Sequence, residues 1–404
     1  MPASSPAPAA VPGAPARAVV ATAFAFLVTM LGTTLPTPLY VIYAAQLSFS
    51  PLTVTLLFAV YAIGVVGALS LFGRLSDDLG RRPVLMIAVT LALLSALLFV
   101  LPPSLPLLIS ARILAGLGAG LMSGTGTAAI MDLFPDDEQT TAGTLAVAAN
   151  TGGLAVGTLL AGALASATPM PLVTPFAAHL VLCVLALAGL AAWAPRHAPR
   201  GHLRIRPQRL SVPASIRGAF ARGVLAAGTG FAMTGVLTAV TALFLARDLG
   251  LASHMLAGFV VFVAFACMAV GQLTARRMQP STALSIGCAG LVLAAGALAV
   301  ALATVTLAPL IAAAIVLGVS CGLSMNAGIA TTVGQVAPAH RGGISSAFFA
   351  GLYCMLTVPA IGVGLLANAI GLREAGLVLA AGVAALAAGV GVFEFACSRT
   401  HKRP

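Results

Sequence analysis

Charged side chains are scarce in this sequence of 404 residues. Asp, Glu, Lys and Arg make up 7% of the chain, hydrophobic residues make up 60%, and the mean hydropathy is +1.08. Soluble domains are about a quarter charged, so this chain has too few charges to cover a surface that faces water. The composition excludes an ordinary soluble protein and indicates a protein of the lipid bilayer.

Clustered cysteines are also missing. The six cysteines lie in or beside apolar runs and none forms a CxxC pair, so we expect small buried side chains, no disulfide framework and no metal site. Segments of about ten residues with alternating polarity, which are typical of membrane barrels, are absent too. Because lipid offers backbone amides no hydrogen-bond partner, the long apolar runs predict helices.

Twelve apolar runs are long enough to cross the bilayer core, which takes roughly 20 residues of helix. They cover residues 18–45, 51–73, 83–101, 105–131, 142–166, 174–194, 219–246, 252–275, 282–304, 308–334, 343–369 and 374–396. The sequence therefore predicts an all-α membrane protein made of two six-helix bundles. The predicted units are a disordered tail (1–17), a first bundle (18–194), a linker (195–218), a second bundle (219–396) and a second tail (397–404).

The two halves repeat weakly. GRLS begins at Gly73 after the second run, and GQLT begins at Gly271 after the eighth. DLFP ends at Pro135 after the fourth run, and QVAP ends at Pro338 after the tenth. Parallel repeats of this kind are typical of transporters that bind their substrate at the midplane between the halves.

The net charge of +11 comes from basic residues in short loops, a placement that indicates membrane topology rather than nucleic-acid binding. If the N-terminus is cytoplasmic, all but three of the 20 Lys and Arg residues lie in cytoplasmic loops and tails. Arg247 and Arg373 fall outside, and Arg112 lies within a span. This pattern predicts two cytoplasmic termini. The dominance of Arg over Lys and the abundant Ala suggest a bacterial protein, and hence the cytoplasmic (inner) membrane.

One loop concentrates charge between the second and third runs. Residues 73–83 read GRLSDDLGRRP, in which two glycines permit tight turns. The segment closely resembles the loop motif GxLaDrxGrr of the major facilitator superfamily, although Asp78 stands where that family usually has a basic residue. The resemblance implies a conformational latch that ties the first bundle to the start of the eleventh helix, with an acidic partner at the end of the fourth helix. Its residues here would be Gly73, Asp77, Gly80, Arg81 and Asp132.

A second motif lies in the fourth run, where residues 111–120 read ARILAGLGAG. Arg112 lies about seven residues into the span, a depth at which a charge is costly and indicates function. Gly116, Gly120 and Gly124 follow on the same helix face and predict close helix packing. The segment resembles the superfamily motif RxxxGxG, whose arginine is linked to proton transfer in proton-coupled members. The alternative is a structural arginine bonded to backbone carbonyls.

A third segment, GLAVGTLLAG at residues 153–162, resembles the fifth-helix signature of drug antiporters. Gly153, Gly157 and Gly162 fit that signature, whereas Thr158 replaces its proline and Ala161 replaces a glycine. The match favours an exporter but lacks the most specific residue. The alternative is ordinary helix packing through small residues.

Polar residues within the spans are candidates for the substrate cavity. Those of the first span recur at helical spacing around Pro36 and Pro38, which interrupt the helix, although threonine hydroxyls also bond their own backbone. The cavity candidates are Thr29, Thr33, Thr37, Tyr40, Asn150, Thr234, Asn326 and Tyr353. His179 could titrate near neutral pH, although a lone histidine in a span is also a common structural residue.

No Asp or Glu lies in the middle of a span, which favours neutral or anionic amphipathic substrates over cationic drugs. Candidates for coupling to protons are Arg112, Asp77 and His179, with Asp132 and Glu394 as further acidic groups. The prediction is a secondary active transporter, a monomer that exports a small amphipathic molecule in exchange for protons by alternating access, without a cofactor. The alternatives are an importer or facilitator of a sugar or organic acid, and, from another class, a membrane sensor or membrane enzyme.

Overall fold

The chain is all helical in the parts that the structure describes. The computed structural model describes residues 15–72, 75–196, 212–336 and 338–400. The first bundle contains α1 (Ala16–Thr34), η1 (Thr37–Leu39), α2 (Tyr40–Gln46), α3 (Pro51–Phe72), α4 (Leu75–Leu79), α5 (Arg81–Val100), α6 (Leu105–Met131), η2 (Asp136–Glu138), α7 (Gln139–Ala167) and α8 (Thr174–Trp193). The second contains η3 (Ala214–Ile216), α9 (Arg217–Arg247), α10 (His254–Ala275), α11 (Pro280–Thr304), α12 (Leu307–Thr332), η4 (Val333–Gln335), α13 (Pro338–Ile370) and α14 (Leu372–Thr400).

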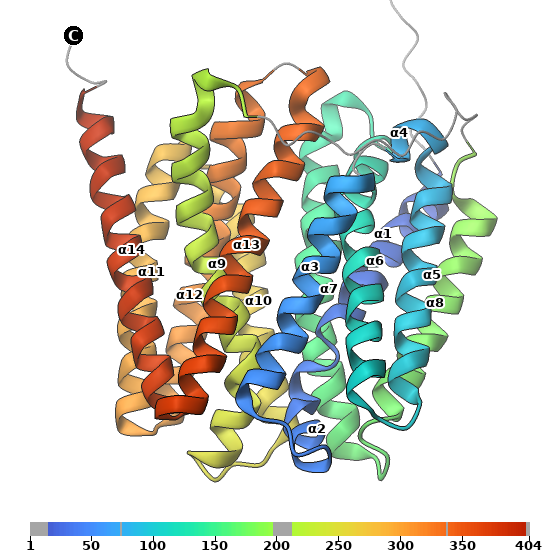
Figure 1. The fold of residues 1–404 in the computed structure, drawn as a ribbon. Coiled ribbons are helices and arrows are strands. Elements are labelled where there is room, and N and C mark those ends of the chain that lie inside the picture. The colour runs from blue at the N-terminus through green and yellow to red at the C-terminus, as the bar shows by residue number, and fades with distance from the viewer. Residues whose placement is uncertain (1–14, 73–74, 197–211, 337, 401–404) are drawn as a thin grey trace, which may run out of the picture.

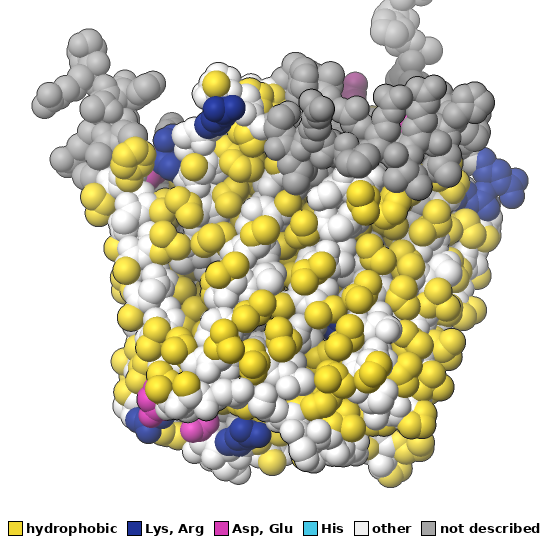
Figure 2. Space-filling view, viewed as in Figure 1, with side chains coloured by type: hydrophobic (Ala, Val, Ile, Leu, Met, Phe, Trp, Pro, Cys, Tyr) yellow, Lys and Arg dark blue, Asp and Glu magenta, His cyan; other side chains and the backbone are white. Residues whose placement is uncertain are grey.

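The twelve predicted spans are confirmed. The described residues contain twelve helices or helix pairs that are long and apolar enough to cross a membrane, the first formed by α1 and α2 together. The flank of the molecule is covered by hydrophobic side chains, and most of the visible charged ones lie near its two ends (Figure 2). Large apolar side chains are strongly exposed, such as Val358 (71%) and Leu293 (68%). Such a surface suits lipid rather than water.

The two six-helix bundles stand side by side (Figure 1). Between them, α7 packs against α10 and α3 packs against α13. We call the side on which α1 begins and α14 ends the terminal side, and the other the far side. Each odd-numbered span begins on the terminal side and each even-numbered span ends there. The short helix α4 therefore also lies on the terminal side (Figure 1).

The first span is broken near the far side, as its two prolines predict. Pro36 and Pro38 carry no N–H, so they cannot donate to the carbonyls of Gly32 and Thr34 as a continuing helix would require. The α-helix ends at Thr34, and a 3-10 turn links it to α2. The carbonyl groups of its last turn are left without helical partners.

The glycine seam of α6 packs against α3 at two positions. A side chain at Gly116 would meet the Tyr61 carbonyl oxygen, and one at Gly120 would meet the Val65 carbonyl oxygen. Gly124 differs from the prediction, because no atom lies within 4 Å of the place where its side chain would begin. The seam therefore ends one turn early, where α6 faces a cavity.

Candidate functional site

A cavity of about 570 Å³ lies between the two bundles in the terminal half of the molecule. Its walls come from α3 to α7 of the first bundle and from α10, α12 and α13 of the second. Cavities of ~300–1,000 Å³ typically hold small molecules. Its polar lining residues are Ser76, Arg81, Ser123, Thr127, Asn150, Gln272, Arg276, Asn326, Ser345 and Ser346. The larger apolar ones are Leu69, Met131, Val147, Met325, Ile329 and Phe349.

Two of the predicted cavity residues, Asn150 and Asn326, line this cavity from opposite bundles. The amide oxygen of Asn150 is buried and has no hydrogen-bond partner among the described residues. A buried acceptor of this kind is costly unless a ligand or water satisfies it. Asn150 is therefore the predicted residue whose geometry best fits a role in binding.

Four other candidates meet in a smaller pocket of about 40 Å³, one turn deeper along α7 and α13. Thr33, Thr234, Thr238 and Tyr353 are among its lining residues. The hydroxyls of the three threonines donate to backbone carbonyls of their own helices at 2.6–2.8 Å. Their remaining lone pairs can accept hydrogen bonds but their protons are engaged.

The remaining first-span candidates do not line either of these cavities. Thr29, Thr37 and Tyr40 are buried in the protein interior, and Thr29 donates to the Ala25 carbonyl at 2.8 Å. The proline break accounts for Thr37 and Tyr40, which follow it, whereas Thr29 precedes it and is buried by the packing of α1 itself. Periodicity alone placed all four residues on one cavity wall.

Aromatic side chains separate the cavity from the far side. The rings of Tyr61 and Tyr353 meet edge to face across the bundles, with 6.2 Å between their centres. Within the second bundle, the Phe231 ring meets the Tyr353 ring edge to face, with 5.3 Å between their centres. Toward the far side the bundles touch directly. The Met255 amide donates to the Ser166 hydroxyl at 3.1 Å. The molecule is thus closed on the far side and hollow in its terminal half.

Arg112 is buried in the first bundle, with 2% of its surface exposed. Its Nη1 donates to the Thr33 carbonyl at 2.7 Å and its Nε to the Leu57 carbonyl at 3.2 Å. The guanidinium carbon lies 4.6 Å from the centre of the Tyr61 ring. Arg112 therefore caps the end of α1 that the proline break leaves without partners. This is the geometry of the structural alternative, and a role in proton transfer stays a prediction.

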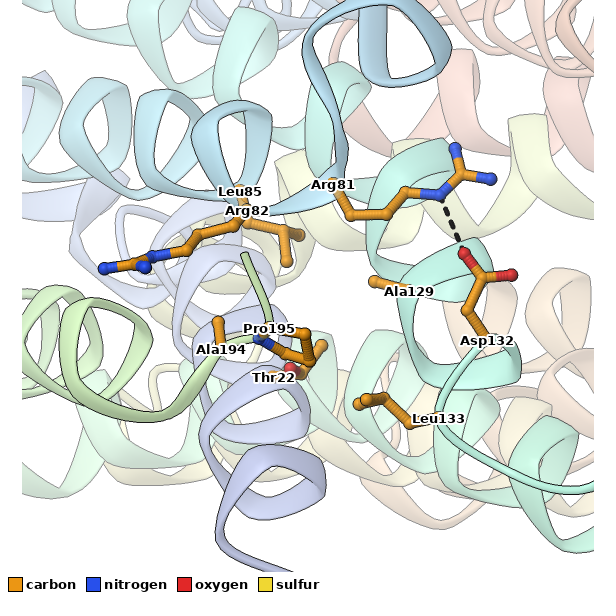
Figure 3. Close-up of a pocket in the computed structure, with 9 residues that line it drawn as sticks. All are labelled: Thr22, Arg81, Arg82, Leu85, Ala129, Asp132, Leu133, Ala194 and Pro195. Atoms are coloured by element: carbon orange, nitrogen blue, oxygen red, sulfur yellow. Dashed lines mark hydrogen bonds and ion pairs between the residues drawn. The ribbon is translucent and has the colours of Figure 1, made fainter. Parts of the chain in front are cut away.

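The contact between Arg81 and Asp132 that the loop motif implies is present. Arg81 Nε donates to the Asp132 carboxylate at 3.0 Å, and its Nη1 donates to the Ser76 hydroxyl at 2.6 Å. Figure 3 shows the Arg81 side chain directed toward Asp132 and the Arg82 side chain directed away from it. Arg82 instead donates to the Ala191 carbonyl near the end of α8, at 2.6 Å.

The other predicted latch residues are Gly73, Asp77 and Gly80. Gly73 and the side chain of Asp77 lie outside the described residues. Gly80 has a φ of 89°, a left-handed value that favours glycine, and it allows the sharp turn between α4 and α5. The action of this cluster as a conformational latch stays a prediction.

His179 is buried in α8, where its Nε2 donates to the Val28 carbonyl at 3.0 Å and its ring lies against Gly32. A side chain at Gly32 would occupy the place of that ring. His179 thus joins α8 to α1, which fits the structural alternative. Glu394, at the terminal end of α14, forms an ion pair with Arg222 at 2.9 Å.

The predicted packing glycines of α7 contact different neighbours. Side chains at Gly153 and Gly157 would meet the carbonyl oxygens of Leu27 and Leu31 in α1. A side chain at Gly162 would meet the His254 carbonyl oxygen in α10, across the bundle interface. One helix therefore uses small residues both within its bundle and between the bundles.

Sequence reasoning missed the part of the cavity wall that links α10 to α7. The Gln272 amide donates to the Thr151 hydroxyl at 3.0 Å, and Arg276 Nη2 donates to the Gly143 carbonyl at 2.8 Å. Both residues belong to the GQLTARR segment, which resembles the first-half loop motif at its start. That repeat was the available signal, because it places the segment at the mouth of the cavity by symmetry.

A family model described as Major Facilitator Superfamily matches residues 22–362. The chain belongs to the Major Facilitator Superfamily. It is therefore a multi-pass membrane transporter and not an enzyme. The structure resembles two crystal structures of a bacterial homologue of the human lysosomal transporter Spinster, both inward-facing. The unoccupied form gives a TM-score of 0.72 at 15% identity over 94% of this chain and 96% of that one. The occupied form gives 0.68 at 15% identity over 95% and 96%.

Relatives by sequence match shorter stretches of this Major Facilitator Superfamily chain. A protein of Cronobacter sakazakii described as "Putative multidrug resistance protein MdtD" is 30% identical over 142 residues, which is 35% of this chain and 30% of that protein. The arabinose-proton symporter of Bacillus subtilis is 38% identical over 88 residues, or 22% of this chain and 19% of that protein. The chain thus matches less than a third of the length of these relatives.

Proposed function

We propose that this transporter exports a small amphipathic molecule from the cytoplasm of a bacterium in exchange for protons. The supporting observation is the cavity of about 570 Å³ between the bundles, which is closed on the far side and has a mixed polar and apolar wall. In this proposal the terminal side faces the cytoplasm, as the placement of arginines predicts. Similarity to multidrug resistance proteins over part of the chain favours export.

Alternating access then requires the far-side contacts to open while the terminal half closes around the contact between Arg81, at the start of α5, and Asp132, at the end of α6. This ion pair is half exposed, with 28% and 54% of the two side chains accessible, so an arriving or departing proton can reach it. A proton or a substrate shifts the balance between the state open to the terminal side and the state open to the far side only if it binds the two states with different affinities. We assign the coupling role to this cluster, including Asp77, before the fully buried Arg112 and His179.

The experiment uses the full chain in liposomes that contain a pH-sensitive dye. A proton gradient is imposed, and matched neutral, anionic and cationic amphiphiles are added in turn. Proton flux that depends on one compound class, is lost in Asp77→Asn and persists in Asp78→Asn supports the proposal. Asp78 is the matched control because it adjoins Asp77 but departs from the family motif.

The importer or facilitator alternative has one observation in its favour, the partial similarity to an arabinose-proton symporter. Uptake of a labelled sugar or organic acid down its own gradient, with no proton flux for any amphiphile, would replace the exporter proposal with this one.

A further inference from the structure

The described wall of the cavity carries positive charge without acidic residues. Arg81 and Arg276 are its charged residues in the described part of the chain, and no Asp or Glu appears among the lining residues there. Arg81 is paired with Asp132. Arg276 is therefore the charge that remains for a ligand.

Arg276 follows the last residue of α10, and its hydrogen-bond partners among the described residues are all neutral. Nη2 donates to the Gly143 carbonyl at 2.8 Å, whereas Nη1 lies 3.4 Å from both the Thr140 carbonyl and the Thr144 hydroxyl. No carboxylate lies within 4 Å of it among the described residues. A guanidinium has five N–H donors, so one short bond and two long ones leave donors for a further partner.

The charge of Arg276 persists at neutral pH. Burial lowers the pKa of its guanidinium, and no acidic neighbour contributes to that shift. Arginine nevertheless stays protonated in proteins. An unpaired positive charge that is partly removed from water gains most from a bound anion, because a charge-assisted bond is about twice as strong as a neutral one.

The rest of the wall suits a molecule with a polar end and an apolar body. Hydroxyl and amide groups of Asn150, Asn326 and Ser346 can bond a polar group, while Met325 and Phe349 offer apolar surface. We propose that the substrate is an amphipathic organic anion, whose carboxylate or sulfonate binds the Arg276 guanidinium. This inference rests on the proposed function only in that the cavity carries the substrate, whatever the direction or coupling of transport.

Binding to the purified full chain in nanodiscs tests the proposal without any gradient. The probes are three sets of compounds with phenylbutyl, naphthylbutyl and decyl bodies, each as the carboxylate, the amide and the amine. For at least one body we expect the carboxylate to bind about tenfold more tightly than its amide, the effect of one added charge-assisted bond, and more tightly than its amine. Arg276→Gln should remove this preference, so that the ratio of carboxylate to amide affinity falls to about one.

Two further variants separate charge from structure. Arg277→Gln is the matched control, because Arg277 adjoins Arg276 and is exposed like it but is not among the residues that line the cavity, so it should keep the preference. Arg276→Lys keeps the charge and should retain preference for the carboxylate. If Arg276 only holds α7 to α10, the lysine and glutamine variants should instead behave alike.

Three results would overturn the proposal: amines that bind more tightly than carboxylates, carboxylates with no advantage over amides in any set, or equal losses in Arg276→Gln and Arg277→Gln. These results are independent of the flux experiment. Preferential carboxylate binding without proton flux would retain the anion site and reject proton-coupled export. Proton flux driven by amines would do the reverse.

Discussion

Replacing Arg112 with leucine should destabilise the first bundle strongly, because Arg112 caps the broken end of α1. The substitution leaves the carbonyls of Thr33 and Leu57 buried without their donor. Each unpaired acceptor costs about 1–3 kcal/mol. Loss of the contact with the Tyr61 ring adds about 0.5–2 kcal/mol. Burial of the leucine side chain offsets about 1.5–3 kcal/mol of this.

The net loss in the free energy of unfolding is therefore about 3 kcal/mol, or a fall of roughly 6–12 °C in Tm for a unit of this size. Thermal unfolding can be followed with a thiol-reactive dye as the rise in signal above that of the exposed Cys354, because Cys183, Cys288 and Cys321 are buried and react on unfolding. Arg277→Leu, at an exposed arginine, is the control and should melt like the wild type.

The result that would refute this reasoning is a Tm of Arg112→Leu within about 2 °C of the wild type, a shift equivalent to less than one kcal/mol. If proton flux were also lost in such a stable variant, Arg112 would act in coupling rather than as a cap. The Tm of Arg112→Lys should lie between those of Arg112→Leu and the wild type, because one ammonium group cannot match the planar guanidinium that reaches both carbonyls.

Three further predictions follow from packing and charge. Gly157→Val should lower the Tm because its side chain would strike the Leu31 carbonyl, whereas Gly152→Val, at a site with no atom within 4 Å, should leave it unchanged. Burial raises the pKa of Asp248 above its ordinary value of 3.8, so ionisation of this carboxyl disfavours the folded state. Asp248→Asn should therefore raise the Tm at pH 7, and the increase should shrink as the pH falls toward 4, where the carboxyl becomes protonated. A disulfide between cysteines placed at Ser166 and Met255, which touch on the far side, should stop substrate flux until a reductant is added, and flux that continues in the oxidised protein would contradict the alternating-access proposal.

Features that depend on residues close together along the chain could be predicted from the sequence. The twelve spans follow from long apolar runs that lipid permits only as helices. The break in α1 follows from Pro36 and Pro38, which lack the N–H that a helix needs. The contact of Arg81 with Asp132 followed from the family resemblance, because the motif fixes both positions in the fold.

Contacts between the bundles could not be predicted in the same way. Periodicity placed Thr29 and Tyr40 on a cavity wall, but the local break and the packing of the bundle decide where such residues point. Conversely, Arg276 resembled any basic residue in a loop until the fold brought the first turn of α7 against it. The sequence also could not decide whether Arg112 only binds carbonyls or takes part in proton transfer, because both roles place the same charge at the same depth.

The α7–α10 seam between the bundles is held by hydrogen bonds at both ends. Arg276 and Gln272 bond across it toward the terminal side, and Met255 bonds Ser166 toward the far side. Under the proposed alternating access, the bond from Met255 to Ser166 breaks each time the far side opens and forms again when it closes. The strength of this one contact therefore contributes to the barrier between the two states, and hence to the rate at which the transporter can turn over.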